Sequence, residues 1–242
     1  MRRGFGVDVG GSGIKGAPVD LDTGALLAER VRSPTPQPAT PGAVARVVGE
    51  VIGPYDGVVG MTLPAVVQGG VARTAANIDP SWVGTDVAGL VHQVTGRRAV
   101  VVNDADAAGV AEARYGAARD VDGLVLVLTL GTGIGSALLV DGRLVPNSEL
   151  GHLQLDGHLA EHRASDAARK RDDLSWEEFA ERVSRYVRHV DLLLHPRRVV
   201  LGGGVSKKSA KWLHLLDVEV EVVPAGLLNE AGIVGAALLA EG

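Results

Sequence analysis

The chain has 242 residues, a formal net charge of −5 and no cysteine. The acidic balance argues against nucleic-acid-binding and membrane-surface proteins, because both classes use basic surfaces to meet phosphate. Without cysteine, disulfides and thiolate metal sites are excluded, and we expect a cytoplasmic protein. We expect no signal peptide, and no apolar run approaches the ~18 residues that a membrane helix needs. Hydrophobic residues make up 46% of the chain and aromatic residues only 3%, which suits aliphatic strands sandwiched between helices.

Two glycine-rich stretches stand out from the start of the chain. The first, FGVDVGGSGIKGAPVD over 5–20, is echoed by LTLGTGIGSALL over 128–139. Each places an apolar run before a Gly/Ser/Thr-rich turn and a second apolar run after it, which predicts two strand, turn, strand units. A glycine-rich turn lets backbone N–H groups converge on an anion. Either copy alone is equally compatible with a plain hairpin, but the repeat favours a pair of phosphate-binding turns.

The remainder of the first half alternates strands with helices. Four prolines in the segment 33–41 remove amide donors and disfavour a helix, so we interpret it as a connecting loop. Apolar periodicity then predicts, in order, a strand over 25–32, a helix over 41–52, a buried strand over 57–62, an irregular connection over 63–80, a helix over 86–94 and a strand over 99–102. A further helix begins at Asn103 and ends near Tyr115.

The second half repeats this organisation after the second hairpin. We expect a polar segment over 146–171, a helix over 176–194, a strand over 198–201, a helix capped by Ser206 and ending near Leu215, a strand over 218–223 and a small-residue helix over 229–240. Gly232 and Gly235 permit that last helix to pack closely on a neighbour. We place a boundary near Asn103, which gives lobes 1–103 and 104–242 that share a cleft, with the helix 229–240 returning to the N-terminal lobe.

Polar residues follow the strand that ends near Val102. Asn103 and Asp104 come where a buried strand passes into a helix, and such strand ends face the ligand in open α/β sheets. The competing interpretation is that Asp104 only caps the helix, and Asp106 competes for that duty. Further along, Glu149 and His152 lie in a polar segment, and with Asn77 and Glu161 they provide groups that hydrogen-bond sugar hydroxyls. Periodicity alone does not bring these residues into one pocket.

Basic residues offer weaker signals. Lys15 follows the first turn and is as compatible with a solvated strand position as with a phosphate contact. Three lysines after the triple glycine, Lys207, Lys208 and Lys211, could line an anion track, although a solvated helix face explains them as well. The run 169–171 is typical of a solvent-facing surface.

Four motifs now match a known family in order and over nearly the whole chain. DVGGSGIKGAPVD and LTLGTGIGSAL resemble the two phosphate motifs of the ROK sugar kinases, VVNDADAA resembles their catalytic motif, and VVLGGGVS resembles their motif near the adenosine of the nucleotide. The resemblance implies an α/β, two-lobed, actin-like (ribonuclease H-like) fold with two similar mixed-sheet domains. Most ROK kinases carry a zinc-binding His and Cys cluster, which this cysteine-free chain cannot form. The segments SELGHLQLDGHLAEHRAS and RTAANIDPSW instead resemble the polyphosphate glucokinase branch.

That resemblance implies an activity and a set of roles. The reaction is transfer of phosphate from inorganic polyphosphate, and possibly ATP, to the C6 hydroxyl of glucose, with Mg²⁺ as cofactor and a homodimer as the assembly. Asp104 is the implied base, Asp8 the implied Mg²⁺ ligand, and Asn77, Asn103, Asp104, Glu149, His152 and Glu161 the implied glucose ligands. The implied donor-phosphate ligands are Asp8, Gly10, Gly11, Ser12, Gly13, Lys15, Thr129, Gly131, Thr132, Gly133, Gly202, Gly203 and Gly204.

Two departures and three alternatives accompany this interpretation. Pro64-Ala65 replaces the family's Pro-Gly in the sugar loop, and Asp106 replaces the final Asn of the catalytic motif. A strictly ATP-dependent ROK hexokinase for glucose or mannose shares every motif. A ROK repressor would carry a winged helix, whereas only about four residues precede the first predicted strand. A non-catalytic sugar-binding or actin-like module would lack Asp104 in this context or the polar set for glucose.

Overall fold

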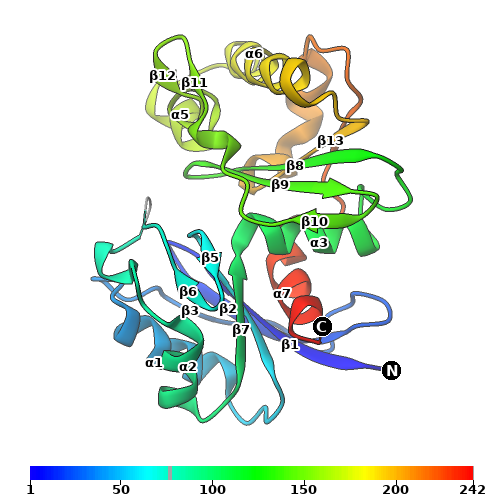
Figure 1. The fold of residues 1–242 in the computed structure, drawn as a ribbon. Coiled ribbons are helices and arrows are strands. Elements are labelled where there is room, and N and C mark those ends of the chain that lie inside the picture. The colour runs from blue at the N-terminus through cyan, green and yellow to red at the C-terminus, as the bar shows by residue number, and fades with distance from the viewer. Residues whose placement is uncertain (76–77, 242) are drawn as a thin grey trace. The chain divides into compact units, whose positions relative to one another are not determined.

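The computed structural model describes residues 1–75 and 78–241 and divides into two compact units. Unit 1 comprises Met1–Ala111 and Glu230–Gly242, and unit 2 comprises Glu112–Asn229. Each unit is built on its own five-stranded mixed sheet (Figure 1). In the described part of the chain, no helix is both long and apolar enough to cross a membrane.

The two sheets have the same topology. The sheet of unit 1 has the order β3-β2-β1-β4-β7, from Val31–Ser33, Ile14–Asp20, Arg3–Val9, Val59–Leu63 and Ala99–Asn103. The sheet of unit 2 has the order β10-β9-β8-β13-β14, from Arg143–Val145, Ile134–Val140, Leu124–Leu130, Arg198–Gly202 and Val222–Pro224. In both, the first three strands pair antiparallel and the last three pair parallel. The predicted repeat and both predicted hairpins are therefore confirmed.

Glycines bring a helix onto the sheet of unit 1 at backbone distance. Helix α7 (Ala231–Glu241) packs on β1 and β4. A Cβ atom added to Gly6 would lie 1.9 Å from the carbonyl oxygen of Ile233, and one added to Gly60 would lie 1.8 Å from that of Ala236. The helix thus meets the sheet through its main chain, and Gly235 meets helix α3 (Asp104–Tyr115) in the same way. The predicted close packing of the last helix is confirmed.

The remaining helices of unit 1 are α1 (Pro41–Ile52) and α2 (Val87–Thr95), which pack against each other. Asp86 caps α2 by accepting a hydrogen bond from the N–H of Gly89 at 2.9 Å. The short elements β5 (Val67–Gln68), β6 (Val71–Ala72) and η1 (Pro80–Trp82) occupy the connection predicted to be irregular. The buried side chain of Trp82 belongs to the core beside β4.

Unit 2 has an aromatic core under its longest helix. Helix α6 (Trp176–Leu194) matches the predicted bounds and starts in a capping box formed by Ser175 and Glu178. Phe179 of α6 packs edge to face on the fully buried Trp212, with ring centroids 5.1 Å apart. The polar segment before α6 consists of η2 (Leu150–His152), β11 (Gln154–Leu155), β12 (His158–Leu159), α4 (Glu161–Ala164) and α5 (Asp166–Arg171).

Three predicted elements are wrong in extent or type. The strand expected over 25–32 is limited to β3, because hydrogen bonds from Gly24 to Asp20 and from Asp20 to Ala25 turn the chain after β2. Instead of an α-helix capped by Ser206, the chain forms the 3₁₀ elements η3 (Gly204–Lys211) and η4 (Leu213–Leu215). The strand expected over 218–223 reduces to β14, and η5 (Leu228–Glu230) precedes α7.

Candidate active site

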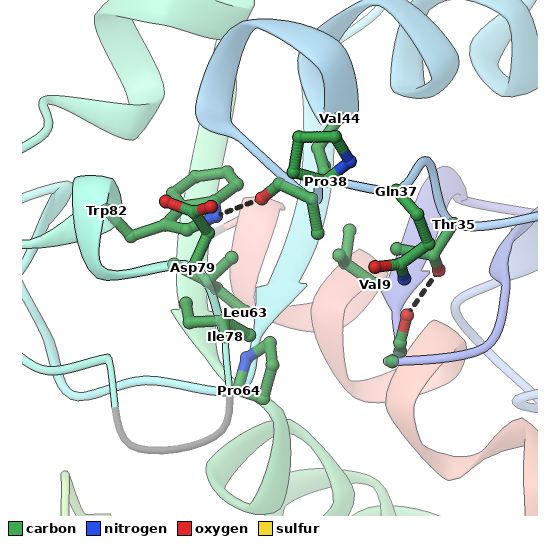
Figure 2. A pocket seen from close by; sticks show the side chains of 13 residues that line it. Val9, Thr35, Gln37, Pro38, Val44, Leu63, Pro64, Ile78, Asp79 and Trp82 are labelled. Carbon is green, nitrogen blue, oxygen red and sulfur yellow. Dashed lines mark hydrogen bonds between the residues drawn. The ribbon is translucent and has the colours of Figure 1, made fainter.

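The first glycine-rich turn is held closed from two sides. It joins β1 to β2, and the N–H of Gly10 donates to the carbonyl of Gly13 at 3.1 Å. The hydroxyl of Thr35 donates to the carbonyl of Gly10 at 2.5 Å (Figure 2). Thr35 belongs to the proline-rich segment, which we expected to be only a connector, and its side chain is buried. Gly11 and Ser12 remain exposed at the tip of the turn, where their N–H groups can meet an anion.

A row of side chains across the sheet fixes the carboxylate next to this turn. Asp8 accepts a hydrogen bond from the Thr62 hydroxyl at 3.0 Å, and the Lys15 ammonium lies 3.5 Å from its other oxygen. The Thr62 hydroxyl in turn accepts from the N–H of Val9 at 3.1 Å. Asp8 and Lys15 are half-buried, so neither is a freely solvated side chain. Sequence reasoning missed Thr62, whose position on a buried strand carried no signal of this role.

Asn103 and Asp104 both accept hydrogen bonds at the start of helix α3, and the Asp104 carboxylate accepts from the N–H of Ala105 at 2.9 Å. The side-chain oxygen of Asn103 accepts from the N–H groups of Ala105 and Asp106 at 2.9 and 3.1 Å. Its amide nitrogen donates to the carbonyl of Ala65 at 3.1 Å, which ties the loop containing Pro64 to the start of α3. Asp104 is half-buried at this helix start, and Asp106 is buried. Asn103 therefore accepts from two N–H groups of the helix start, and Asp104 shares one of them.

A cavity of about 260 Å³ lies within unit 1 beside the first turn. Its walls come from the turn, the proline-rich segment, the end of β4 and the η1 region, including Gly10, Gly11, Thr35, Pro38, Leu63, Pro64, Ile78, Asp79 and Trp82 (Figure 2). The Trp82 indole N–H donates to the carbonyl of Ala39 at 2.8 Å, which holds the proline-rich wall in place. Asn77, predicted to bind sugar, lies outside the described residues.

The second turn, in unit 2, is supported by two neighbouring segments. The N–H of Gly131 donates to the carbonyl of Gly133 at 3.0 Å, and the carbonyl of Gly131 accepts from the N–H of Ala167 in α5 at 3.0 Å. Gly203 has a φ of 82°, and a Cβ atom there would lie 2.4 Å from the carbonyl oxygen of Leu130. The triple glycine Gly202–Gly204 thus lies directly against the strand that leads into the turn, while Thr132 is exposed at its tip.

Glu149, His152 and Glu161 form one group next to this turn. The imidazole of His152 lies between the two carboxylates, with Nδ1 3.9 Å from Glu149 and Nε2 3.7 Å from Glu161. Glu161 also accepts from the N–H of Ile134, the first residue after the turn, at 3.2 Å. Burial raises the pKa of Glu149, and the Glu161 carboxylate adds to this while His152 opposes it. These contacts bring together three predicted sugar ligands that lie up to twelve residues apart in sequence.

Two serines that sequence reasoning missed hold this group on β9. The Ser136 hydroxyl donates to the carbonyl of Ser148 at 2.7 Å and accepts from the N–H of Leu150 at 3.0 Å. Gly151 then allows η2 to touch the sheet, because a Cβ atom there would lie 2.2 Å from the carbonyl oxygen of Ile134. The described residues contain no group of three or more His, Asp or Glu side chains able to hold a metal ion.

Comparisons with known proteins identify the family of the chain and its relatives. The model of the ROK family matches residues 4–168. A polyphosphate glucokinase of Mycobacterium tuberculosis is 49% identical over 241 residues, covering 98% of this chain and 91% of the relative. The crystal structure of an inorganic polyphosphate/ATP-glucomannokinase from Arthrobacter sp. strain KM matches with a TM-score of 0.97 and 51% identity, covering 100% of this chain and 99% of that one. A ROK family glucokinase from Streptomyces griseus, in complex with glucose and AMPPNP, shares the fold with a TM-score of 0.85 at 24% identity over 99% of each chain.

Proposed function

The chain belongs to the ROK family, and from this premise we propose that it is a glucokinase that uses inorganic polyphosphate, and also ATP, to phosphorylate the C6 hydroxyl of glucose. The observation that carries the proposal is the half-buried carboxylate of Asp104 at the end of a buried strand, where Asn103 already accepts from two N–H groups of the helix start. The identity of 49% to a polyphosphate glucokinase supports the choice of donor and acceptor.

Asp104 acts as the general base in the proposed reaction. The C6 oxygen of glucose attacks the terminal phosphorus in line, the bond from that phosphorus to the bridging oxygen breaks, and the shortened chain leaves with the electron pair. The hydroxyl proton passes late to the Asp104 carboxylate, because phosphoryl transfer depends mainly on positioning and charge stabilisation. A positioned base of this kind contributes about 10²–10⁴-fold to the rate.

The two turns bind the donor phosphates in this proposal. Gly11 and Ser12 in unit 1, and Thr132 in unit 2, are exposed at the tips of their turns, where their N–H groups would donate to phosphate oxygens, and Lys15 adds a cation beside the first turn. Asp8 fits a magnesium ligand, because it is a single anchored, partly exposed carboxylate next to a phosphate turn, and Mg²⁺ is commonly held by one or two carboxylates together with substrate phosphates. Bound magnesium would neutralise negative charge on the donor.

Glu149, His152 and Glu161 hold glucose hydroxyls together with Asn103 and Asn77. Carboxylates accept from hydroxyl groups and an imidazole can donate or accept, so the group in unit 2 offers both kinds of partner. Mannose is a second proposed acceptor, because the polyphosphate/ATP-glucomannokinase from Arthrobacter is 51% identical to this chain. A homodimer is the proposed assembly, on family resemblance.

The test is the substitution Asp104→Asn, assayed with glucose and polyphosphate. We expect the kcat to fall by about 10²–10⁴-fold, while the Kd for glucose, measured by calorimetry, stays within a few-fold of the wild type. Asp86→Asn is the matched control, because Asn caps α2 as well as Asp does, and its kcat should not change. Turnover of Asp104→Asn close to that of the wild type would contradict the assignment of the base.

A further inference from the structure

Three of the five lysines in the chain lie in the eight residues of η3. Lys207, Lys208 and Lys211 are all exposed, and no ion pair joins any of them to a described carboxylate. The basic residues of α5 differ, because Arg169 and Lys170 both pair with Asp166, at 3.0 and 2.7 Å. In a chain with a net charge of −5, η3 is thus a local concentration of positive charge that is not neutralised by its surroundings.

The start of η3 is fixed next to the second turn. Gly203 approaches the carbonyl of Leu130, the last residue of β8, so closely that no side chain fits between them. The Ser206 hydroxyl then donates to the carbonyl of Gly203 at 2.7 Å, which starts the 3₁₀ geometry. At the other end, Trp212 is fully buried against Phe179. The lysines therefore project from a segment that is anchored at both ends within unit 2.

Trp176 joins η3 to α5 on the other flank of the same turn. The guanidinium of Arg169 lies 4.5 Å from the centre of the Trp176 ring, and the ammonium of Lys208 lies 6.0 Å from it. Helix α5 itself is bonded to the turn through Ala167 and Gly131. We call the surface formed by Lys207, Lys208, Lys211, Arg169 and Trp176 the lysine platform. It connects two basic runs that are separate segments in the sequence.

We propose that the lysine platform binds the part of a polyphosphate chain that extends beyond the phosphates held at the second turn. This inference rests on the proposed function and adds a determinant of donor length to it. Inorganic polyphosphate is a flexible polyanion with a charge on every unit. Lysine suits it because its mobile ammonium group acts as a point charge and requires no fixed planar partner. ATP and tripolyphosphate carry only three phosphates, so we expect the platform to matter far less for them than for a long chain.

The test compares donors of different length on a charge-removed variant. In Lys207→Gln/Lys208→Gln/Lys211→Gln, we expect the KM for polyphosphate of several hundred units to rise about 10-fold or more, with kcat unchanged. The KM values for tripolyphosphate and ATP should stay within 2-fold of wild type. By analogy with single-stranded polyanions, three lost contacts should also reduce the slope of log(kcat/KM) against log[salt] by about 2.

Two control variants and a binding assay keep the test decisive. Replacing the exposed residues Arg46, Arg98 and Arg143 by Gln removes the same charge away from η3 and should leave every KM unchanged. Replacing the three lysines by Arg keeps the charge and should retain long-chain use. An equal rise in KM for all donors in the triple lysine-to-Gln variant would contradict the proposed role of the platform. An unchanged KM for long-chain polyphosphate would contradict it as well. If the wild type turned over no polyphosphate, the proposed function would fail, and calorimetric binding of long polyphosphate to the two Gln variants would still decide the platform.

Discussion

The two glycine-rich turns occupy equivalent places in two sheets of the same topology, yet they present different groups. In unit 1, Asp8 pairs across the hairpin with Lys15, while at the equivalent register in unit 2 Thr129 pairs with Gly135. At this register unit 1 thus carries a carboxylate and an ammonium group and unit 2 carries a hydroxyl group, while the Glu161 carboxylate of unit 2 is bonded to the first residue after its turn. Two sheets of the same topology can therefore present different chemical groups at equivalent positions, and the proposed function assigns each turn a different role in donor binding.

The same contrast appears in how each sheet is covered. In unit 1, α7 meets the sheet through glycines, main chain against main chain. In unit 2, large side chains including Phe179, Tyr186 and Trp212 fill the space under α6. The sheet of unit 1 therefore has less freedom to accommodate added atoms than the sheet of unit 2.

The largest predicted loss is in kcat/KM for the donor, and it differs between the equivalent positions of the two turns. Asp8→Asn should lower kcat/KM for the donor by about 10²-fold or more, because it removes the anchored charge, and a hydrogen bond to a charged group contributes more than one between neutral groups. Thr129→Val should lower it only about 5-fold, the value of roughly one neutral hydrogen bond. Steady-state kinetics with polyphosphate as the varied substrate measures both. Equal losses of kcat/KM in the two variants would contradict the proposed difference in role between the two turns.

A second, smaller effect is a difference in unfolding free energy between variants in the core of unit 1 and in the core of unit 2. Gly6→Ala places a methyl group where the carbonyl of Ile233 lies, and overpacking of this kind costs about 1–3 kcal/mol in unfolding free energy. In unit 2, Phe179→Leu should cost less than about 1.5 kcal/mol if the core repacks around the smaller side chain. Urea denaturation monitored by circular dichroism compares the two variants. A smaller loss for Gly6→Ala than for Phe179→Leu would contradict the contrast in packing.

The weakest predicted effect is a pH dependence within unit 2. Burial raises the pKa of Glu149 in the folded state, so the folded state binds the proton more tightly than the unfolded chain does. The free energy of unfolding therefore falls as the pH rises from about 4.3, the ordinary pKa of Glu, through the folded pKa. Glu149→Gln should therefore raise Tm at pH 7, with no gain below about pH 4, while weakening glucose binding.

Glu178→Gln serves as the opposite control for this pH dependence. Hydrogen bonds from Ser175 lower the pKa of Glu178, so its contribution to stability is present above the ordinary pKa and is lost as pH falls through the folded value. The substitution should lower Tm at pH 7. Thermal melts across pH 3–8 compare both variants. A lower Tm for Glu149→Gln at pH 7 would contradict the expected direction of the effect.

Strong local patterns were predictable from the sequence, and long-range contacts were not. The hairpins and α6 follow from alternation, glycine turns and a continuous apolar stripe. Thr62 and Thr35 could not be recognised, because their partners, Asp8 and Gly10, are distant in sequence. The same limit applies to η3, where an α-helix was predicted across the lysines but the chain forms a 3₁₀ segment that starts at the close contact of Gly203 with Leu130.

Capping shows why local rules were ambiguous at the site itself. Asn103, Asp104 and Asp106 are all good capping residues, so the sequence could not choose among them. In the structure Asn103 accepts from the N–H groups of Ala105 and Asp106, and Asp104 also accepts from that of Ala105. Conversely, the grouping of Glu149, His152 and Glu161 was expected only from family resemblance. Ser136 and Gly151 hold this group on β9 through contacts with residues that are distant from them in the sequence.

The use of polyphosphate is tested most simply by incubating the purified wild-type protein with glucose, Mg²⁺ and long-chain polyphosphate in the absence of nucleotide, and measuring glucose 6-phosphate over time. We predict steady formation of glucose 6-phosphate with matching loss of terminal phosphate units, and formation with ATP in a parallel reaction. Glucose 6-phosphate formed from ATP alone would contradict the polyphosphate assignment, and none from either donor would contradict the kinase itself.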